Sequence, residues 1–206
     1  SEASAPGPAP AAWRSRSAAE RARVLAAIGD AVADRVDGLA AAISEEMGKP
    51  TAQAAGEVKL AASIYHWYAE HGPALLEPES LDVSGARENT VTVGPVGPLV
   101  GVVPWNYPYY QVARFAAPNL MAGNTVILKH ASICAKSSAL IERIQREAGL
   151  PADAYVNVYA SSDQVAEMIA DPRVHGVSLT GSGGARAARA AGGGGGPAKS
   201  GGGVGG

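Results

Sequence analysis

The sequence has little cysteine, little net charge and no long apolar run. Its single cysteine excludes an intramolecular disulfide framework and a multi-cysteine zinc site, and it is typical of a reducing, cytoplasmic setting. A formal net charge of −2 favours neither nucleic acid nor an anionic membrane as a partner. Every apolar run is interrupted by glycine, proline or charge before the roughly 18 residues that a membrane span needs. The four histidines lack metal-ligand spacing, so we expect a cytoplasmic protein without a metal site.

Glycine is abundant, but half of the glycine residues lie at the C-terminal end of the sequence. Thirteen of the 26 glycines fall between Gly181 and Gly206. Because a genuine glycine tail of this kind is a flexible linker, our hypothesis is that residues 183–206 belong to the preceding domain and that many of their glycines stand for side chains that were never identified. An intact mass equal to that of the written sequence would contradict this. Residues 1–12, rich in proline and alanine, are expected to be an extended lead-in.

The hydrophobic pattern predicts a helical region followed by alternating strands and helices. Apolar side chains recur at helical spacing through residues 13–72, with Ser17 and Glu20 forming a capping-box pattern near the start. Gly72 and Pro73 are expected to end this region. Residues 90–182 instead alternate short β-branched runs with helical stretches. We expect strands over 90–93, 99–103, 125–128, 155–159 and 174–179, and helices over 109–121, 137–148 and 162–170. The fold class is therefore α/β, with a Rossmann-like, mostly parallel sheet and flanking helices in one cofactor-binding domain, residues 13–182.

Three of the predicted strands are followed by polar residues. The first leads to Pro104-Trp105-Asn106, the next to Lys129, and the last to Thr180-Gly181-Ser182. Ligands of parallel sheets bind beyond the carboxyl ends of the strands. We therefore expect these three segments to lie on one edge of the sheet.

Each of these polar residues has two interpretations. A rigid asparagine between Pro104 and Pro108 can donate its amide to an oxyanion, but Asn106 can equally be a turn residue that bonds its own backbone. Lys129 can hold a ribose hydroxyl or a phosphate, or be a solvated lysine that closes a strand. Ser182 can bind an anion at a helix start, or only cap that helix.

The remaining candidates are a thiol and three tyrosines. Lysines near Cys134 in the sequence can lower its pKa, although a buried small hydrophobe is the favoured interpretation. Tyr107, Tyr109 and Tyr110 can line an apolar substrate passage or belong to the core.

These segments together resemble the aldehyde dehydrogenase superfamily. Glu46-Met47-Gly48-Lys49-Pro50 is similar to the family's motif between early helices, and residues 104–108 are similar to its oxyanion segment. Residues 120–129 resemble its cofactor strand, and residues 179–182 resemble its pyrophosphate turn. The order and spacing of all four agree. The run Lys129-His130-Ala131-Ser132 is most similar to the NADP-dependent succinate-semialdehyde dehydrogenase branch.

The resemblance implies oxidation of an aldehyde to the acid through a cysteine thiohemiacetal, with hydride passing to NADP or NAD. It assigns roles residue by residue: Asn106 to the oxyanion, Lys129 to the adenosine ribose, Gly181 and Ser182 to the pyrophosphate, Pro104 and Trp105 to the border of the cofactor, and Tyr107 to the substrate tunnel. Ser132 stands where many NAD-using members carry a ribose-binding glutamate. Because a carboxylate there would repel a 2′-phosphate and a hydroxyl would not, we predict that NADP is used at least as well as NAD.

The departures from the family pattern are also specific. Arg186 stands in place of a glycine, and Gly203 stands where the family carries its general-base glutamate. The nucleophilic cysteine of the family lies beyond Gly206, and Cys134 is not in that motif. We therefore expect the sequence to be the cofactor-binding portion, without the catalytic domain, of a homo-oligomeric enzyme. The alternative is a complete, non-catalytic nucleotide-binding or interaction module. Arg114 is a candidate for binding a substrate carboxylate, although a surface or packing role is favoured.

Overall fold

A four-stranded parallel sheet lies at the centre of the computed structural model, which describes residues 10–82 and 89–181. The strand order is β5-β4-β3-β6, and all three neighbouring pairs are parallel. The strands are β3 Pro98–Val102, β4 Thr125–Lys129, β5 Tyr155–Asn157 and β6 Gly176–Leu179. The mostly parallel α/β sheet expected from the sequence is confirmed.

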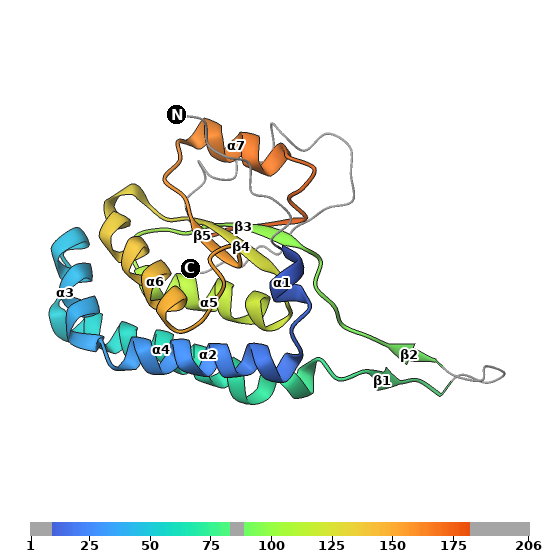
Figure 1. The fold of residues 1–206 in the computed structure, drawn as a ribbon. Coiled ribbons are helices and arrows are strands. Elements are labelled where there is room, and N and C mark those ends of the chain that lie inside the picture. The colour runs from blue at the N-terminus through green and yellow to red at the C-terminus, as the bar shows by residue number, and fades with distance from the viewer. Residues whose placement is uncertain (1–9, 83–88, 182–206) are drawn as a thin grey trace.

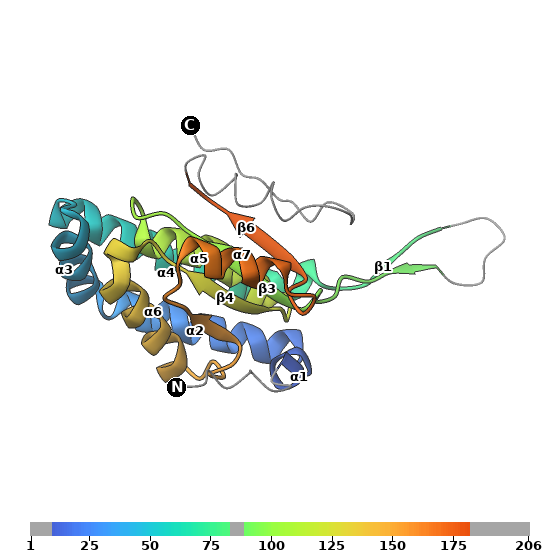
Figure 2. The ribbon, with the colours of Figure 1, turned by 90° about the horizontal axis from the view of Figure 1, so that it is seen from above.

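Helices cover both faces of this sheet (Figure 1). One face carries α7, and the other carries α5 and α6, with α2 and α4 forming a further layer beyond them. Figure 2 shows the same sheet from above, with α7 crossing over it. The helices are α1 Pro10–Arg14, α2 Ala18–Ala33, α3 Val36–Met47, α4 Thr51–Leu75, α5 Pro108–Met121, the 3-10 turn η1 Ser132–Cys134, α6 Ala135–Glu147 and α7 Ser162–Ala170. This layering buries the core between the sheet and the α2–α4 layer.

Local sequence signals fix several helix ends. Ser17 and Glu20 form the expected capping box at the start of α2, with the Ser17 hydroxyl accepting from the Glu20 amide at 3.2 Å. Gly48 ends α3 in the left-handed conformation with φ of 74°. The lead-in is shorter than expected, because α1 already begins at Pro10.

Helix α4 continues past the point where the sequence predicts its end. Gly72 and Pro73 both lie inside it, and it ends at Leu75. Pro73 removes one hydrogen bond of the helix near its end, whereas Gly72 is buried against Met121 of α5. Packing on α5 therefore outweighs the local stop signal. Pro118 is tolerated in the same way near the end of α5.

A two-stranded arm projects from the body (Figure 1). It consists of β1 Glu79–Ser80 and β2 Thr90–Val91, paired antiparallel. Strand β2 is half as long as the predicted strand over 90–93, and β1 has no counterpart among the predictions. All four residues are exposed, so no alternation of apolar and polar positions marks them.

Candidate functional site

The three polar segments start from neighbouring strands. Val102, the last residue of β3, is in register with both Lys129 of β4 and Leu179 of β6. The pairing continues past the strands, because the Thr180 amide donates to the Val102 carbonyl at 2.9 Å. The prediction that these strand ends share one edge is confirmed. Ser182 lies outside the described residues.

The segment between β3 and α5 presents its side chains to solvent. Trp105 and Tyr107 are 53% and 47% exposed, Asn106 is exposed, and Pro104 is half-buried. The carboxamide of Asn106 makes no hydrogen bond to its own backbone or to any other residue that the structure describes. This removes the alternative of a turn asparagine that satisfies itself, and it leaves an amide donor free at the edge of the sheet.

The backbone of the same segment is held by side chains from elsewhere. The Lys49 ammonium donates to the Asn106 carbonyl at 2.7 Å and lies 3.9 Å from the centre of the Tyr107 ring. The Cys134 thiol faces the Trp105 carbonyl at 3.8 Å. Free side chains on a fixed backbone are what a preorganised donor site needs.

His130 fixes the start of α5 from the side of the sheet. Its Nε2 lies 3.1 Å from the Pro108 carbonyl. Burial lowers the pKa of His130 below its usual 6.5. The imidazole is therefore neutral at pH 7, and its Nε2–H donates to that carbonyl.

Glu57 caps α5 from another helix. Tyr107 supplies no side-chain cap, and the Glu57 carboxylate instead accepts from the Tyr109 and Tyr110 amides at 2.9 and 3.3 Å. Glu57 is 4% exposed, and its other oxygen contacts Lys49. A carboxylate on the exposed amides of a helix N-terminus is favourable.

Glu46 caps the N-terminus of α6 in the same way. Its carboxylate accepts from the Lys136 amide and from both the amide and the hydroxyl of Ser137, the latter two at 2.9 and 2.6 Å. Two carboxylates therefore anchor two helix starts, Glu57 that of α5 after β3 and Glu46 that of α6 after β4. Both helices begin at the edge where the polar segments meet.

Lys129 and Ser132 offer a free cation and a free hydroxyl at this edge. Lys129 is half-buried and Ser132 exposed, and neither side chain makes a hydrogen bond or ion pair with a described residue. An ammonium and a hydroxyl that both follow one strand suit ribose hydroxyls or a phosphate. Gly181, after β6, has φ of 145°, and a Cβ there would meet no atom of the described residues within 4 Å. Open backbone at a strand end, where only glycine is unstrained, suits a pyrophosphate, so the residues present fit a dinucleotide.

Comparison with known proteins decides the family. The model of the aldehyde dehydrogenase family matches residues 2–195. The chain belongs to the aldehyde dehydrogenase family.

Similar members of this family include succinate-semialdehyde dehydrogenases. The chain is 46% identical over 176 residues to the NADP(+) enzyme of Deinococcus radiodurans, and 40% identical over 176 residues to the NAD(P)+ enzyme Sad of Escherichia coli K12. These matches cover 85% of this chain but only 37% and 38% of the two relatives. The structure of succinic semialdehyde dehydrogenase from Streptococcus pyogenes with NADP+ has a TM-score of 0.84 and 37% identity, over 88% of this chain and 40% of that one.

Cys134 is not a reactive thiol of this aldehyde dehydrogenase chain. It is fully buried, and desolvation, with smaller contributions from Glu46 and Glu57, raises the pKa of its thiol to about 12. Lys49 lowers that pKa, but by less than burial raises it. The interpretation as a small buried hydrophobe fits this environment.

The three tyrosines divide between core and surface. Tyr109 is 1% exposed, so it belongs to the core and not to a passage. Tyr107 and Tyr110 lie edge to face with ring centroids 6.0 Å apart. Arg114 is exposed one turn beyond Tyr110 and has no partner among the described residues.

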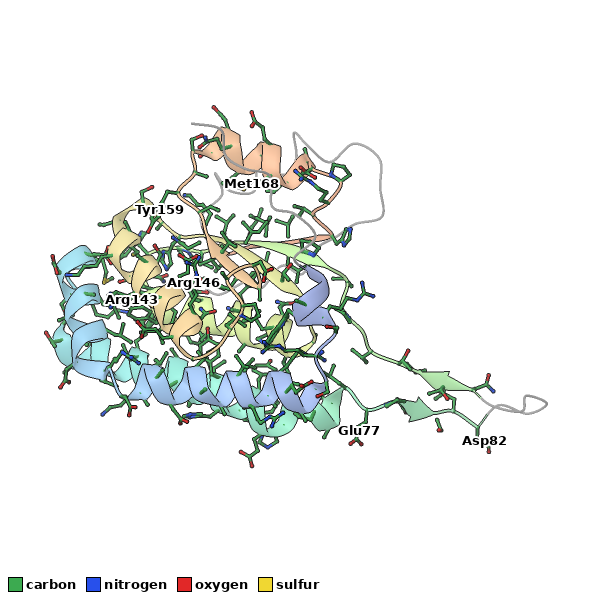
Figure 3. The ribbon with its side chains drawn as sticks, in the orientation of Figure 1. Glu77, Asp82, Arg143, Arg146, Tyr159 and Met168 are labelled. Carbon is green, nitrogen blue, oxygen red and sulfur yellow. The ribbon has the colours of Figure 1, made fainter. Side chains whose placement is uncertain are left out.

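Sequence reasoning missed the residues that act across long distances in the chain. Lys49 and Glu46 stood in a motif noticed only by resemblance, and Glu57 carried no signal. Tyr159 was also missed: it follows β5 at the same edge, is 67% exposed, and donates its hydroxyl to the Ala135 carbonyl at 3.2 Å (Figure 3). The predicted strand over 155–159 includes Tyr159, whereas β5 ends at Asn157, so the residue falls in the segment after the strand, where ligands of parallel sheets bind.

In residues 10–82 and 89–181, no three His, Cys, Asp or Glu side chains are placed to hold a metal. Nor does that part of the chain contain a helix both long enough and apolar enough to cross a membrane.

Proposed function

We propose that this chain supplies the cofactor-binding edge and the oxyanion donor of an enzyme that oxidises an aldehyde, a semialdehyde such as succinate semialdehyde, to the carboxylic acid with NADP. The observation that carries the proposal is the free carboxamide of Asn106 on a backbone fixed beside Lys129 at one edge of the sheet. The buried Cys134 cannot serve as the nucleophile. We therefore place the cysteine that forms the thiohemiacetal outside the residues of the printed sequence.

Asn106 donates its amide N–H to the oxygen that becomes negative when a thiolate adds to the aldehyde. Such a donor is most effective when it is already in place, because no reorganisation is needed during the reaction. Lys129 holds the ribose or its phosphate, and the Gly181 turn lets backbone amides approach the pyrophosphate. NADP, when bound, accepts the hydride. Trp105 and Pro104 border the site, and the exposed ring of Tyr107 faces the substrate.

Preference for NADP depends on Ser132 in this proposal. We expect kcat/KM with NADP to be at least as high as with NAD. A Ser132→Glu substitution places a carboxylate beside the 2′-phosphate and is expected to lower kcat/KM for NADP by about tenfold or more while sparing NAD. Steady-state kinetics with both cofactors measure this, and Ser63→Glu, which adds the same charge at an exposed position of α4, is the control. A strong preference for NAD in the unmodified protein would refute the prediction.

Substrate choice depends on Arg114 in this proposal. Tyr107, Tyr110 and Arg114 follow one another at helical spacing, so the guanidinium lies on the tyrosine side of α5. We expect Arg114→Leu to raise KM for succinate semialdehyde about tenfold and to leave KM for a neutral aldehyde of equal length unchanged, because only the first has a carboxylate to pair. Arg143→Leu, which removes an exposed arginine from α6, is the control. Equal effects on both aldehydes would show that Arg114 has only a surface role.

A further inference from the structure

Lys49 and Glu57 form a buried ion pair beneath the segment that carries Asn106. Their side chains are only 9% and 1% exposed, and the two charged groups are in contact. A buried ion pair contributes little stability by itself, because desolvation of both charges offsets their attraction. Stability therefore does not explain why the pair lies beneath this segment.

Both members of the pair hold the backbone that follows the Asn106 side chain. Lys49 donates to the carbonyl of Asn106 itself at 2.7 Å. Glu57 accepts from the amides of Tyr109 and Tyr110, which begin α5. The position of the Asn106 Cα is thus fixed from its own carbonyl and from the helix that follows it.

The other bonds to this stretch reach residues on either side of Asn106 but not Asn106 itself: the Cys134 thiol faces the Trp105 carbonyl, the Gln111 amide donates to the Tyr107 carbonyl at 3.0 Å, and His130 donates to the Pro108 carbonyl at 3.1 Å. Pro104 and Pro108 have no N–H to donate, and the side chains of residues 105–107 are exposed. Tyr107 provides no side-chain cap for α5. Without Lys49, the Asn106 carbonyl would lose its hydrogen bond, and the Glu57 carboxylate would be left buried beside the first turn of the helix without a counter-charge.

We propose that Lys49 and Glu57 are positioning residues for Asn106: the buried pair sets the place of the oxyanion-binding amide by clamping the backbone around it. This inference rests on the proposed function of Asn106. A displacement of about 1 Å at a reacting group can cost on the order of a hundredfold in rate. The clamp consequently acts on kcat, and it does so without touching cofactor or substrate.

The test compares Lys49→Met and Asn106→Ala, alone and combined, in the full protein. Two further variants complete the set. Lys49→Met/Glu57→Gln removes the bond to Asn106 without leaving an unpaired buried charge, and its glutamine still accepts from the two helix amides. Lys136→Met removes a lysine from an exposed pair with Glu45 and is the matched control. The readouts are kcat, KM for NADP, melting temperature, and hydrogen–deuterium exchange of the amides of residues 109–111, which donate to Glu57 and to the Tyr107 carbonyl.

The expected result has three parts. Lys49→Met lowers kcat by about tenfold to a hundredfold with KM for NADP within about twofold, and adds nothing further to Asn106→Ala, because both changes disable the same amide. The amides of residues 109–111 exchange faster in Lys49→Met and in the double variant, whereas the peptides of α2 do not. Lys136→Met behaves as the unmodified protein. If Lys49→Met alone strongly lowers the melting temperature, the kcat and the amide exchange of Lys49→Met/Glu57→Gln decide whether the clamp exists.

Full kcat and unchanged amide exchange in Lys49→Met and in Lys49→Met/Glu57→Gln would overturn the clamp. It would also be overturned if the loss of kcat in Lys49→Met multiplied with the loss of kcat in Asn106→Ala. Different results would contradict the proposed function. The unmodified protein would not oxidise aldehydes, or Asn106→Ala would have the same kcat as the unmodified protein. Exchange of the amides of residues 109–111 still decides the clamp in that case, because it does not depend on turnover.

Discussion

Single side chains from distant helices complete both ends of α5. Glu57 caps the first turn of α5, and at the other end of α5 the Trp13 indole donates to the Leu120 carbonyl at 3.0 Å and Arg21 donates to the Met121 carbonyl at 2.8 Å. Carboxylates at helix N-termini and donors at C-termini agree with the direction of the helix dipole. Sequence alone predicts a cap such as that of Ser17, whose partner is three residues away. It does not predict Glu57, whose partners are 52 and 53 positions distant.

Protonation of His130 is expected to destabilise the protein at low pH. Because burial lowers the pKa of His130 in the folded state, the unfolded chain binds the proton first. The free energy of unfolding should therefore fall as pH drops below about 6.5, with a slope of at most about 1.4 kcal/mol per pH unit from this group. His130→Gln can still donate to the Pro108 carbonyl but does not titrate, so its melting temperature should change less between pH 7.5 and 5.5. His71→Gln, at an exposed position, is the control. Parallel curves for His130→Gln and the unmodified protein would contradict the assignment.

At the scale of elements, the sequence predicts which segments are helices and strands better than it predicts where they end. The helix over 162–170 is as expected, and its Ser161 forms a capping box with Gln164. Helix α4 runs beyond its predicted stop because Gly72 lies against Met121 of α5, a contact between positions that the sequence does not relate. Strand β1 is missed because two exposed residues carry no periodic signal.

Two glycines of α4 are expected to respond oppositely to alanine. Gly56 is exposed with open space around it, so Gly56→Ala should stabilise the helix by about 0.5–1 kcal/mol. At Gly72 a Cβ would lie 2.4 Å from Cγ of Met121. Gly72→Ala should therefore destabilise the protein by about 1–3 kcal/mol, because α4 and α5 must move apart. Thermal or urea unfolding of both variants measures the difference. Stabilisation by Gly72→Ala would show that α4 and α5 are not in such close contact.

At the scale of the whole molecule, one edge of the sheet gathers the candidate site. The alternation of strands and helices in the sequence predicts a parallel sheet, and therefore that Asn106, Lys129 and Gly181 share an edge. The observed strand order places β3 between β4 and β6. That order was not predictable from the residues, because each strand is a short apolar run that can pair with any other. Ser182 and the residues after it lie outside the described part of the chain, so their assignment to the pyrophosphate stays a prediction. The homo-oligomer expected from the resemblance also stays a prediction.

A crystal structure of the protein with NADP+ bound measures this shared edge most directly. We expect the dinucleotide to lie across the carboxyl ends of β4, β3 and β6, with its 2′-phosphate within hydrogen-bond distance of Lys129 or Ser132 and its nicotinamide end beside Asn106. A nucleotide bound at another place, or an Asn106 carboxamide turned away from the nicotinamide, would contradict the proposed function.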